Sequence, residues 1–294
     1  MLYGGGQRHA SRLSRRAMLC GVAGLMGAWP VPAHGKAELS LGLTPVFLDS
    51  DMNVLSWLQR YLAQQLDRPV RIVKQRTHRD ASTALLAGQL DAAWVSDFLY
   101  VQFQDRLALL AVPLYRHQPF RQAFVIVNKA SKASTFDEIR GSTHAFSDPD
   151  STSGYLITRW LLALRRESPA AFFRNFFFTY SHRNVVRAVG NGLADSGSLE
   201  GYVWEVMKER EPELVDNTRI VYRSEWLGFP PIVALDTTRD VPDIRALTAA
   251  LLGMTSDRFG REILSLLALD GFATARAALY ESTVEKWRVV KAQA

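Results

Sequence analysis

Strand-like and helix-like segments alternate along this chain, and this alternation constrains its fold more than any other feature. Residues 39–43, 70–73 and 91–95 are short and mostly apolar runs, which is typical of strands. Between them, apolar residues recur at helical spacing over 54–66, and 81–87 has a shorter helical pattern. Strands separated by helices pair in parallel, so the sequence predicts an α/β fold with a parallel sheet.

The second half of the chain repeats this plan. The expected strands are 124–127, 144–146, 176–180, 195–199 and 232–235. The expected helices are 154–166, 184–189 and a helical region from Asp243 to the end. The phenylalanine-rich segment 172–178 is expected to form core and strand rather than a ligand site. No stretch has the composition of a long flexible linker.

The first 33 residues have the composition of a secretory signal. A region with four arginines and no acidic residue (1–16) precedes an apolar run (17–29) and a small-residue cleavage site at 31–33. The apolar run is too short for a membrane span, which needs about 20 residues. The phrase S-R-R-A-M-L resembles a twin-arginine signal, with an ordinary signal as the alternative. We therefore expect an exported, periplasmic protein.

Charge and cysteine content exclude several function classes. Removing 1–33 removes four of 35 basic residues and none of 29 acidic ones, so the net charge falls from +6 to +2. A net charge of +2 is too small for the basic surface that a nucleic-acid-binding protein typically has. The single cysteine, Cys20, lies in the expected signal, which excludes a disulfide framework and a cysteine-built zinc site.

The most informative motif is D-P-D-S-T-S-G-Y-L at 148–156, between an expected strand and an expected helix. Ser151, Thr152 and Ser153 place three hydroxyls where the first N–H groups of a helix have no partner. Together with the positive end of the helix dipole they make a site for an anion. A plain helix cap is the alternative, but three hydroxyls followed by glycine favour ligand binding.

This motif resembles the signature of the periplasmic phosphonate/phosphite/phosphate-binding proteins of ABC transporters, which are type II periplasmic binding proteins. The resemblance covers nearly the whole chain after the signal and includes the phrase at 88–94, Ser181-His182 and Trp204. It implies two α/β lobes, each a sheet flanked by helices, that close on a ligand in the cleft between them.

The resemblance also implies how the chain divides. Lobe 1 would comprise 38–122 plus 233–294, and lobe 2 would comprise 123–232. The two strands that cross between the lobes would be 124–127 and 232–235.

The family's oxyanion contacts imply a first set of site residues. The hydroxyl motif carries over to Ser151, Thr152 and Ser153, and a histidine that follows a serine carries over to His182. This histidine would supply an N–H donor, or a positive charge if protonated. Its alternative role is to cap the helix that begins near Asn184.

Departures from the family bear on the substrate. Members that bind aminoalkylphosphonates place two tyrosines and two carboxylates around the cleft. The tyrosine positions fall on His78 and near Arg121, and the acid positions fall near Tyr202 and among Phe229 and Pro230. Because an ammonium group without a paired acid is costly to bury, we expect a ligand without one: phosphate, phosphite, sulfate, another small oxyanion or an organic anion.

These placements leave alternatives open. His78 and Arg121 would add donors and positive charge to the cleft, unless they face solvent. The nearby acids Glu200 and Asp97 would restore a contact for a cation if the alignment is shifted. Tyr202 stays in the set of expected ligand contacts.

The expected function is capture of a small oxyanion in an interlobe cleft, for uptake through the membrane permease of an ABC transporter. The alternative is a ligand-sensing module that reports to a membrane sensor kinase. An enzyme is not expected, because the sequence holds no G-x-S-x-G elbow, phosphate-binding loop or H-E-x-x-H helix. No metal, cofactor or nucleic acid is expected.

Overall fold

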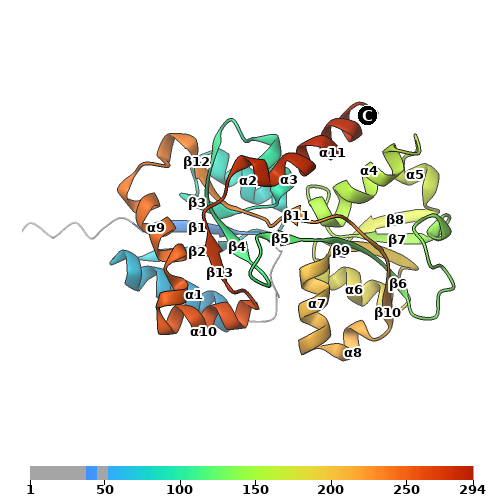
Figure 1. Ribbon diagram of the computed structural model, residues 1–294, viewed down its shortest axis with the longest axis horizontal. Helices are drawn as coiled ribbons and strands as arrows, with labels where there is room; N and C mark the ends of the chain where they lie inside the picture. The colour runs from blue at the N-terminus through green and yellow to red at the C-terminus, as the bar shows by residue number, and fades with distance from the viewer. Residues whose placement is uncertain (1–37, 45–51, 294) are drawn as a thin grey trace, which may run out of the picture. The chain divides into compact units, whose positions relative to one another are not determined.

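The computed structural model describes residues 38–44 and 52–293, which form two sheets flanked by helices and a short two-stranded pair (Figure 1). This agrees with the expected α/β fold class. The expected export signal and Cys20 lie outside the described residues. Within them, no helix combines the length and apolar character that crossing a bilayer requires.

The first sheet has six strands in the order β13-β4-β12-β3-β1-β2. Its strands are β1 (Leu39–Leu43), β2 (Val70–Lys74), β3 (Ala92–Trp94), β4 (Leu107–Leu114), β12 (Ile232–Leu235) and β13 (Gly271–Ala273). Strand β1 pairs in parallel with both β2 and β3, as the alternation of strands and helices predicts. The other strands join antiparallel.

Helices cover both faces of this sheet (Figure 1). They are α1 (Met52–Leu66), α2 (His78–Leu86), α3 (Asp97–Gln102), α9 (Pro242–Leu252) and α10 (Arg258–Leu267). Alternation along β3 explains the two layers, because successive side chains of a strand point to opposite faces. Ala92 and Trp94 belong to the cluster with α1, α9 and α10, whereas Ala93 packs with Leu85 of α2.

The second sheet has five strands in the order β10-β6-β9-β7-β8. They are β6 (Ala123–Asn128), β7 (Thr143–Phe146), β8 (Asn175–Phe178), β9 (Ser196–Glu200) and β10 (Thr218–Arg223). The surrounding helices are α4 (Ile157–Ala163), α5 (Pro169–Phe172), α6 (His182–Gly190), α7 (Gly201–Arg210) and α8 (Pro212–Val215). The phenylalanine-rich segment packs in the core around Phe146, as expected.

The expected crossing strands are wrong. Strand β6 lies inside the five-stranded sheet and β12 lies inside the six-stranded sheet. The chain instead passes between the sheets through β5 (Phe120–Arg121) and β11 (Leu227–Gly228), which pair antiparallel. Two-residue strands are too short to leave an alternating pattern in the sequence. The lobe boundaries 38–122, 123–232 and 233–294 stay predictions.

The C-terminal region differs from the expected run of helices. Strand β13 interrupts it and pairs with β4, so this region extends the first sheet. The last helix, α11 (Glu281–Lys291), packs against both α3 and α4. Short 3-10 turns complete the fold at Asp137–Ile139, Asp236–Thr238, Met254–Ser256 and Ala277–Tyr280.

A buried histidine lies in the second sheet, on the strand between β9 and the edge strand β8. His144 on β7 is fully buried, and its Nδ1 and Nε2 lie 2.7 Å and 2.8 Å from the hydroxyls of Ser196 and Ser198. Its ring stacks on Phe173. Burial lowers the pKa of His144 to about 3.

This pKa makes His144 a source of acid sensitivity. Below the ordinary pKa of 6.5 the unfolded chain takes up a proton here, and the folded chain does not until about pH 3. Stability is therefore lost as pH falls from 6.5 towards 3. At pH 4.5 the contribution is roughly 2 to 3 kcal/mol.

We predict that His144→Asn loses less unfolding free energy between pH 7 and pH 4.5 than the unmodified protein, by roughly that 2 to 3 kcal/mol. Urea denaturation at pH 7 and at pH 4.5 measures the unfolding free energy of each protein. The control is His117→Asn, since the His117 side chain is 86% exposed. Equal losses in His144→Asn and His117→Asn would contradict the assignment.

Candidate functional site

The hydroxyl motif begins a helix with an unusual first turn. Ser151 is the N-cap, and its Oγ accepts a hydrogen bond from the Gly154 N–H at 3.0 Å. Residues Thr152–Leu156 form a π-helical turn that continues into α4. Ser151 is therefore used as a cap, and the hydroxyls of Thr152 and Ser153 are directed elsewhere.

Gly154 allows this turn to form. A Cβ atom at this position would lie 1.7 Å from the Ser147 Oγ and 2.7 Å from the Ser147 Cβ. Both distances are far below van der Waals contact. The glycine that follows the three hydroxyls thus lets the start of the helix lie directly against the end of β7.

The two remaining hydroxyls bind carboxylates. Thr152 Oγ1 donates to Asp97 Oδ1 at 2.7 Å and accepts from the Phe98 N–H at 3.0 Å. Ser153 Oγ donates to Glu200 Oε2 at 2.6 Å. Asp97 is the first residue of α3 and lies shortly after the end of β3. Glu200 is the last residue of β9.

Arg121 lies between these two acids. Its Nη2 is 2.5 Å from Asp97 Oδ1 and its Nε is 2.7 Å from Glu200 Oε1, and its side chain is 1% exposed. Asp97 Oδ2 accepts a further hydrogen bond from Thr283 Oγ1 of α11 at 2.9 Å. The third guanidinium nitrogen, Nη1, is buried without a hydrogen-bond partner in the described part of the chain, and Nε meets Glu200 as an ion pair rather than through a hydrogen bond.

This arrangement corrects one expectation and bears on another. Asp97 and Glu200, which the sequence analysis names as alternatives, both lie at Arg121, and the absence of acids at the positions near Tyr202 and among Phe229 and Pro230 stays a prediction. The positive charge expected from Arg121 is not free, because both acids pair with it. Sequence reasoning named these acids only as alternatives, and one signal does point to them: each stands at the C-terminal end of a buried strand, where α/β folds bind ligands.

The two histidines stand at helix N-termini. His78 is the first residue of α2, and its backbone N–H donates to Asp148 Oδ2 at 3.2 Å. His182 is the first residue of α6, where Ser181 provides the cap. The alternative role considered for His182, capping this helix, therefore belongs to Ser181. His182 Nδ1 accepts from the Glu200 N–H at 3.1 Å, which leaves the proton of the neutral ring on Nε2.

Burial controls the charge of this cluster. It lowers the pKa of His182, and the neighbouring His78 and Arg121 lower this pKa further because a protonated His182 would be repelled by their charged forms. Burial also lowers the pKa of His78, against the opposing effect of nearby acids, chiefly Asp148. Both histidines are thus neutral at pH 7 and act as hydrogen-bonding groups. Burial raises the pKa of Glu200 to about 7, although Arg121 opposes the shift.

His78 also has an unpaired ring nitrogen. Its side chain is buried, and Nδ1 has no hydrogen-bond partner within 38–44 and 52–293. At the rim, Arg79 pairs with Asp150 through two hydrogen bonds of 2.8 Å and 2.9 Å. Four helix N-termini, two unpaired buried nitrogens and three hydroxyls therefore converge at one place.

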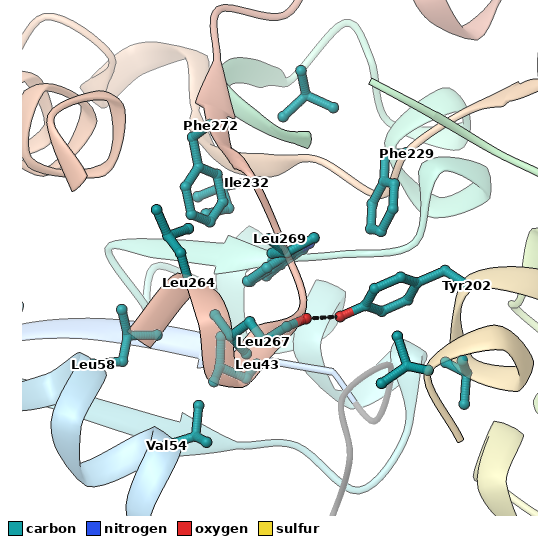
Figure 2. Close-up of a cluster of buried hydrophobic side chains, with 14 of the residues drawn as sticks. Leu43, Val54, Leu58, Tyr202, Phe229, Ile232, Leu264, Leu267, Leu269 and Phe272 are labelled. Atoms are coloured by element: carbon teal, nitrogen blue, oxygen red, sulfur yellow. Dashed lines mark hydrogen bonds between the residues drawn. The ribbon is translucent and has the colours of Figure 1, made fainter. Parts of the chain in front are cut away.

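Tyr202 is directed away from this convergence. Its hydroxyl donates to the backbone carbonyl of Leu267, as Figure 2 shows, and its ring packs edge-on against Tyr115 and Phe229. The proposed ligand contacts therefore leave Tyr202 out, because its hydroxyl already donates a hydrogen bond to the Leu267 carbonyl.

A model of a known family matches residues 41–280, and its description is "ABC transporter, phosphonate, periplasmic substrate-binding protein". The chain belongs to this family. As a phosphonate-family binding protein it is the substrate-binding component of an ABC importer, with a small-molecule ligand and a membrane permease as partners. The family is periplasmic. The match gives no support to the alternative of a sensor for a membrane kinase.

Solved structures share the fold. PhnD1 from Prochlorococcus marinus, in complex with methylphosphonate, has a TM-score of 0.76 at 19% identity and covers 86% of this chain and 98% of its own. A binding protein component of an ABC phosphonate transporter from Pseudomonas aeruginosa has a TM-score of 0.78 at 18% identity, with coverages of 87% and 89%. A Xanthomonas citri protein bound to ATP has a TM-score of 0.69 at 21% identity, with coverages of 87% and 98%.

We predict that Gly154→Ala lowers the unfolding free energy by about 1 to 3 kcal/mol, because the new methyl group overlaps Ser147. Adding Ser147→Gly removes the obstructing side chain and should restore part of the loss. Urea denaturation of both single variants and the double variant measures this. A Gly154→Ala protein as stable as the unmodified one would contradict the packing described.

Proposed function

We propose that this binding protein captures a small oxyanion of the phosphonate, phosphite or phosphate type at Thr152 and Ser153, for uptake by an ABC transporter. Arg121, His78 and His182 would complete the site. The methylphosphonate bound to the Prochlorococcus relative supports a ligand of this size and charge.

The observation that carries the proposal is the pair of buried nitrogens without partners. Leaving a buried polar group unpaired costs about 1 to 3 kcal/mol, so Arg121 Nη1 favours a ligand that supplies an acceptor. His78 Nδ1 would be a second donor in the tautomer that carries the ring proton on this atom. A phosphonate or phosphite has three oxygens and phosphate has four, so each can accept hydrogen bonds from several donors at once. The adjacent helix N-termini add favourable dipoles for negative charge.

Binding requires the hydroxyls to change partners. Thr152 and Ser153 donate to Asp97 and Glu200 in this structure. A ligand oxygen would take over these hydrogen bonds, while Arg121 stays paired with both acids. Protonation of Glu200, whose pKa is raised to about 7, would make the exchange easier because the neutral acid no longer repels the ligand.

The test compares two altered proteins. We predict that Thr152→Val with Ser153→Ala weakens the binding of methylphosphonate, phosphite or phosphate about tenfold or more, because two hydrogen bonds to a charged ligand are lost. Isothermal titration calorimetry measures the affinity for each anion.

The matched control is Ser168→Ala. Ser168 caps the short helix α5 by accepting from the Ala171 N–H, so it tests the loss of a capping hydroxyl away from the site. The Ser168→Ala protein should bind each anion with the affinity of the unmodified protein. Equal affinities in the double variant and in the unmodified protein would exclude the hydroxyl motif as the binding site.

A further inference from the structure

We propose that the C-terminal helix α11 is a clasp that holds the candidate site shut in the free protein and sets how fast a ligand enters and leaves. The helix packs against both α3 and α4 (Figure 1), and α4 continues the turn that the hydroxyl motif begins. This inference rests on the proposed function and adds a conformational control to the same site.

The site is closed in this structure. The Thr152 hydroxyl accepts a hydrogen bond from the Phe98 N–H, so α3 lies directly against the motif. All residues proposed to hold the ligand are at most 3% exposed: His78, Arg121, Thr152, Ser153 and His182. A ligand of the size of methylphosphonate can therefore reach the hydroxyls only if α3 and the start of α4 move apart.

One side of α11 is anchored to the first sheet. The preceding residue, Tyr280, is 1% exposed, and its hydroxyl donates to the Phe229 carbonyl at 3.0 Å. Val284 and Trp287 of α11 pack against the same buried cluster as Tyr280. The Trp287 ring also meets the Phe98 ring of α3 edge-on, with the ring centroids 4.9 Å apart. Helix α11 is thus fixed to the layer that carries α3.

The other side of α11 contacts α4. Val290 is 4% exposed and lies in one apolar cluster with Ala163 of α4. Lys286 Nζ lies 4.6 Å from the centroid of the Trp160 ring, and Gln293 Nε2 donates to the Ala163 carbonyl at 2.6 Å. Because α11 is anchored beside α3, these contacts with α4 must break before α3 and α4 can part.

Lys286 makes this contact specific. Its side chain is 6% exposed, and its ammonium group pairs with Glu225 and donates to Ser282 Oγ at 2.9 Å. Glu225 lies between β10 of the second sheet and β11, so the ion pair ties α11 to the segment by which the chain leaves that sheet. Lysine is rarely buried unless it is paired. The ion pair and the Trp160 ring together hold this ammonium group in one position.

The first test measures the rates of methylphosphonate binding by stopped flow in two variants. Lys286→Met removes the ion pair and the cation over Trp160 but keeps an unbranched side chain, and Val290→Ala removes two methyl groups from the apolar cluster. A weaker clasp opens more often, so each variant should speed both association and dissociation by about threefold to thirtyfold. The dissociation constant should change less than about threefold, because entry and release use the same opening.

Each variant has a matched control of the same chemistry away from α11. Lys208→Met removes a cation that lies 5.2 Å from the Trp204 ring centroid, and Val215→Ala truncates a valine of α8 that is 1% exposed. Both controls should keep the rates of the unmodified protein, even where urea denaturation shows a loss of stability. Rates that rise as much in the controls as in Lys286→Met and Val290→Ala would indicate general loosening and overturn the inference.

A second test needs no substitution. Small-angle X-ray scattering should give the free, unmodified protein the same radius of gyration as the protein saturated with methylphosphonate, because the clasp holds the site shut in both. A free protein that contracts when methylphosphonate binds would be open without its ligand, which would contradict the clasp.

The outcomes separate the two proposals. If the unmodified protein binds neither methylphosphonate, phosphite nor phosphate, the proposed function fails. If it binds them and both rates are unchanged in Lys286→Met and Val290→Ala, the clasp is excluded and the function stands. Faster dissociation with unchanged association would also overturn the inference, because α11 would then affect only the bound state.

Discussion

The ion pairs of Arg121 with Asp97 and Glu200 are the interaction on which the site depends. A buried guanidinium and two buried carboxylates are each costly to remove from water, and only their mutual pairing offsets that cost. The three side chains come from β5, the start of α3 and the end of β9. Their pairing therefore fixes three segments of the chain relative to one another, and the hydroxyl motif takes its position from the two acids.

The fold brings these groups together through a common feature of α/β proteins. Strands β3, β7 and β8 lead into helices α3, α4 and α6, and strand β9 ends at Glu200. Helix N-termini supply unpaired N–H groups, and the caps Ser96, Ser151 and Ser181 satisfy some of them. The groups left unpaired, Arg121 Nη1 and His78 Nδ1, are those that a ligand would complete.

The sequence predicted the elements that have enough length to show a pattern. Strand β12 was predicted with its observed bounds, because four consecutive apolar residues leave little alternative. The crossing strands β5 and β11 could not be predicted, because two residues carry no periodicity. Strand β13 was missed because its three residues lie within a largely helical region.

The sequence indicated residues of the candidate site but not how their charges pair. The sequence pointed to the hydroxyl motif, His78, His182 and Arg121, and the structure brings them together. It could not show that Asp97 and Glu200 meet Arg121, because these residues are far apart in sequence and their contact depends on how two sheets are connected. Pairing between distant buried charges is a tertiary property that spacing along one chain does not encode.

A crystal structure of the protein with methylphosphonate would test the account most directly. The account predicts that the phosphonate oxygens lie within hydrogen-bond distance of the Thr152 and Ser153 hydroxyls, with Arg121 still between Asp97 and Glu200. A ligand bound elsewhere, with both hydroxyls still donating to the acids, would contradict it.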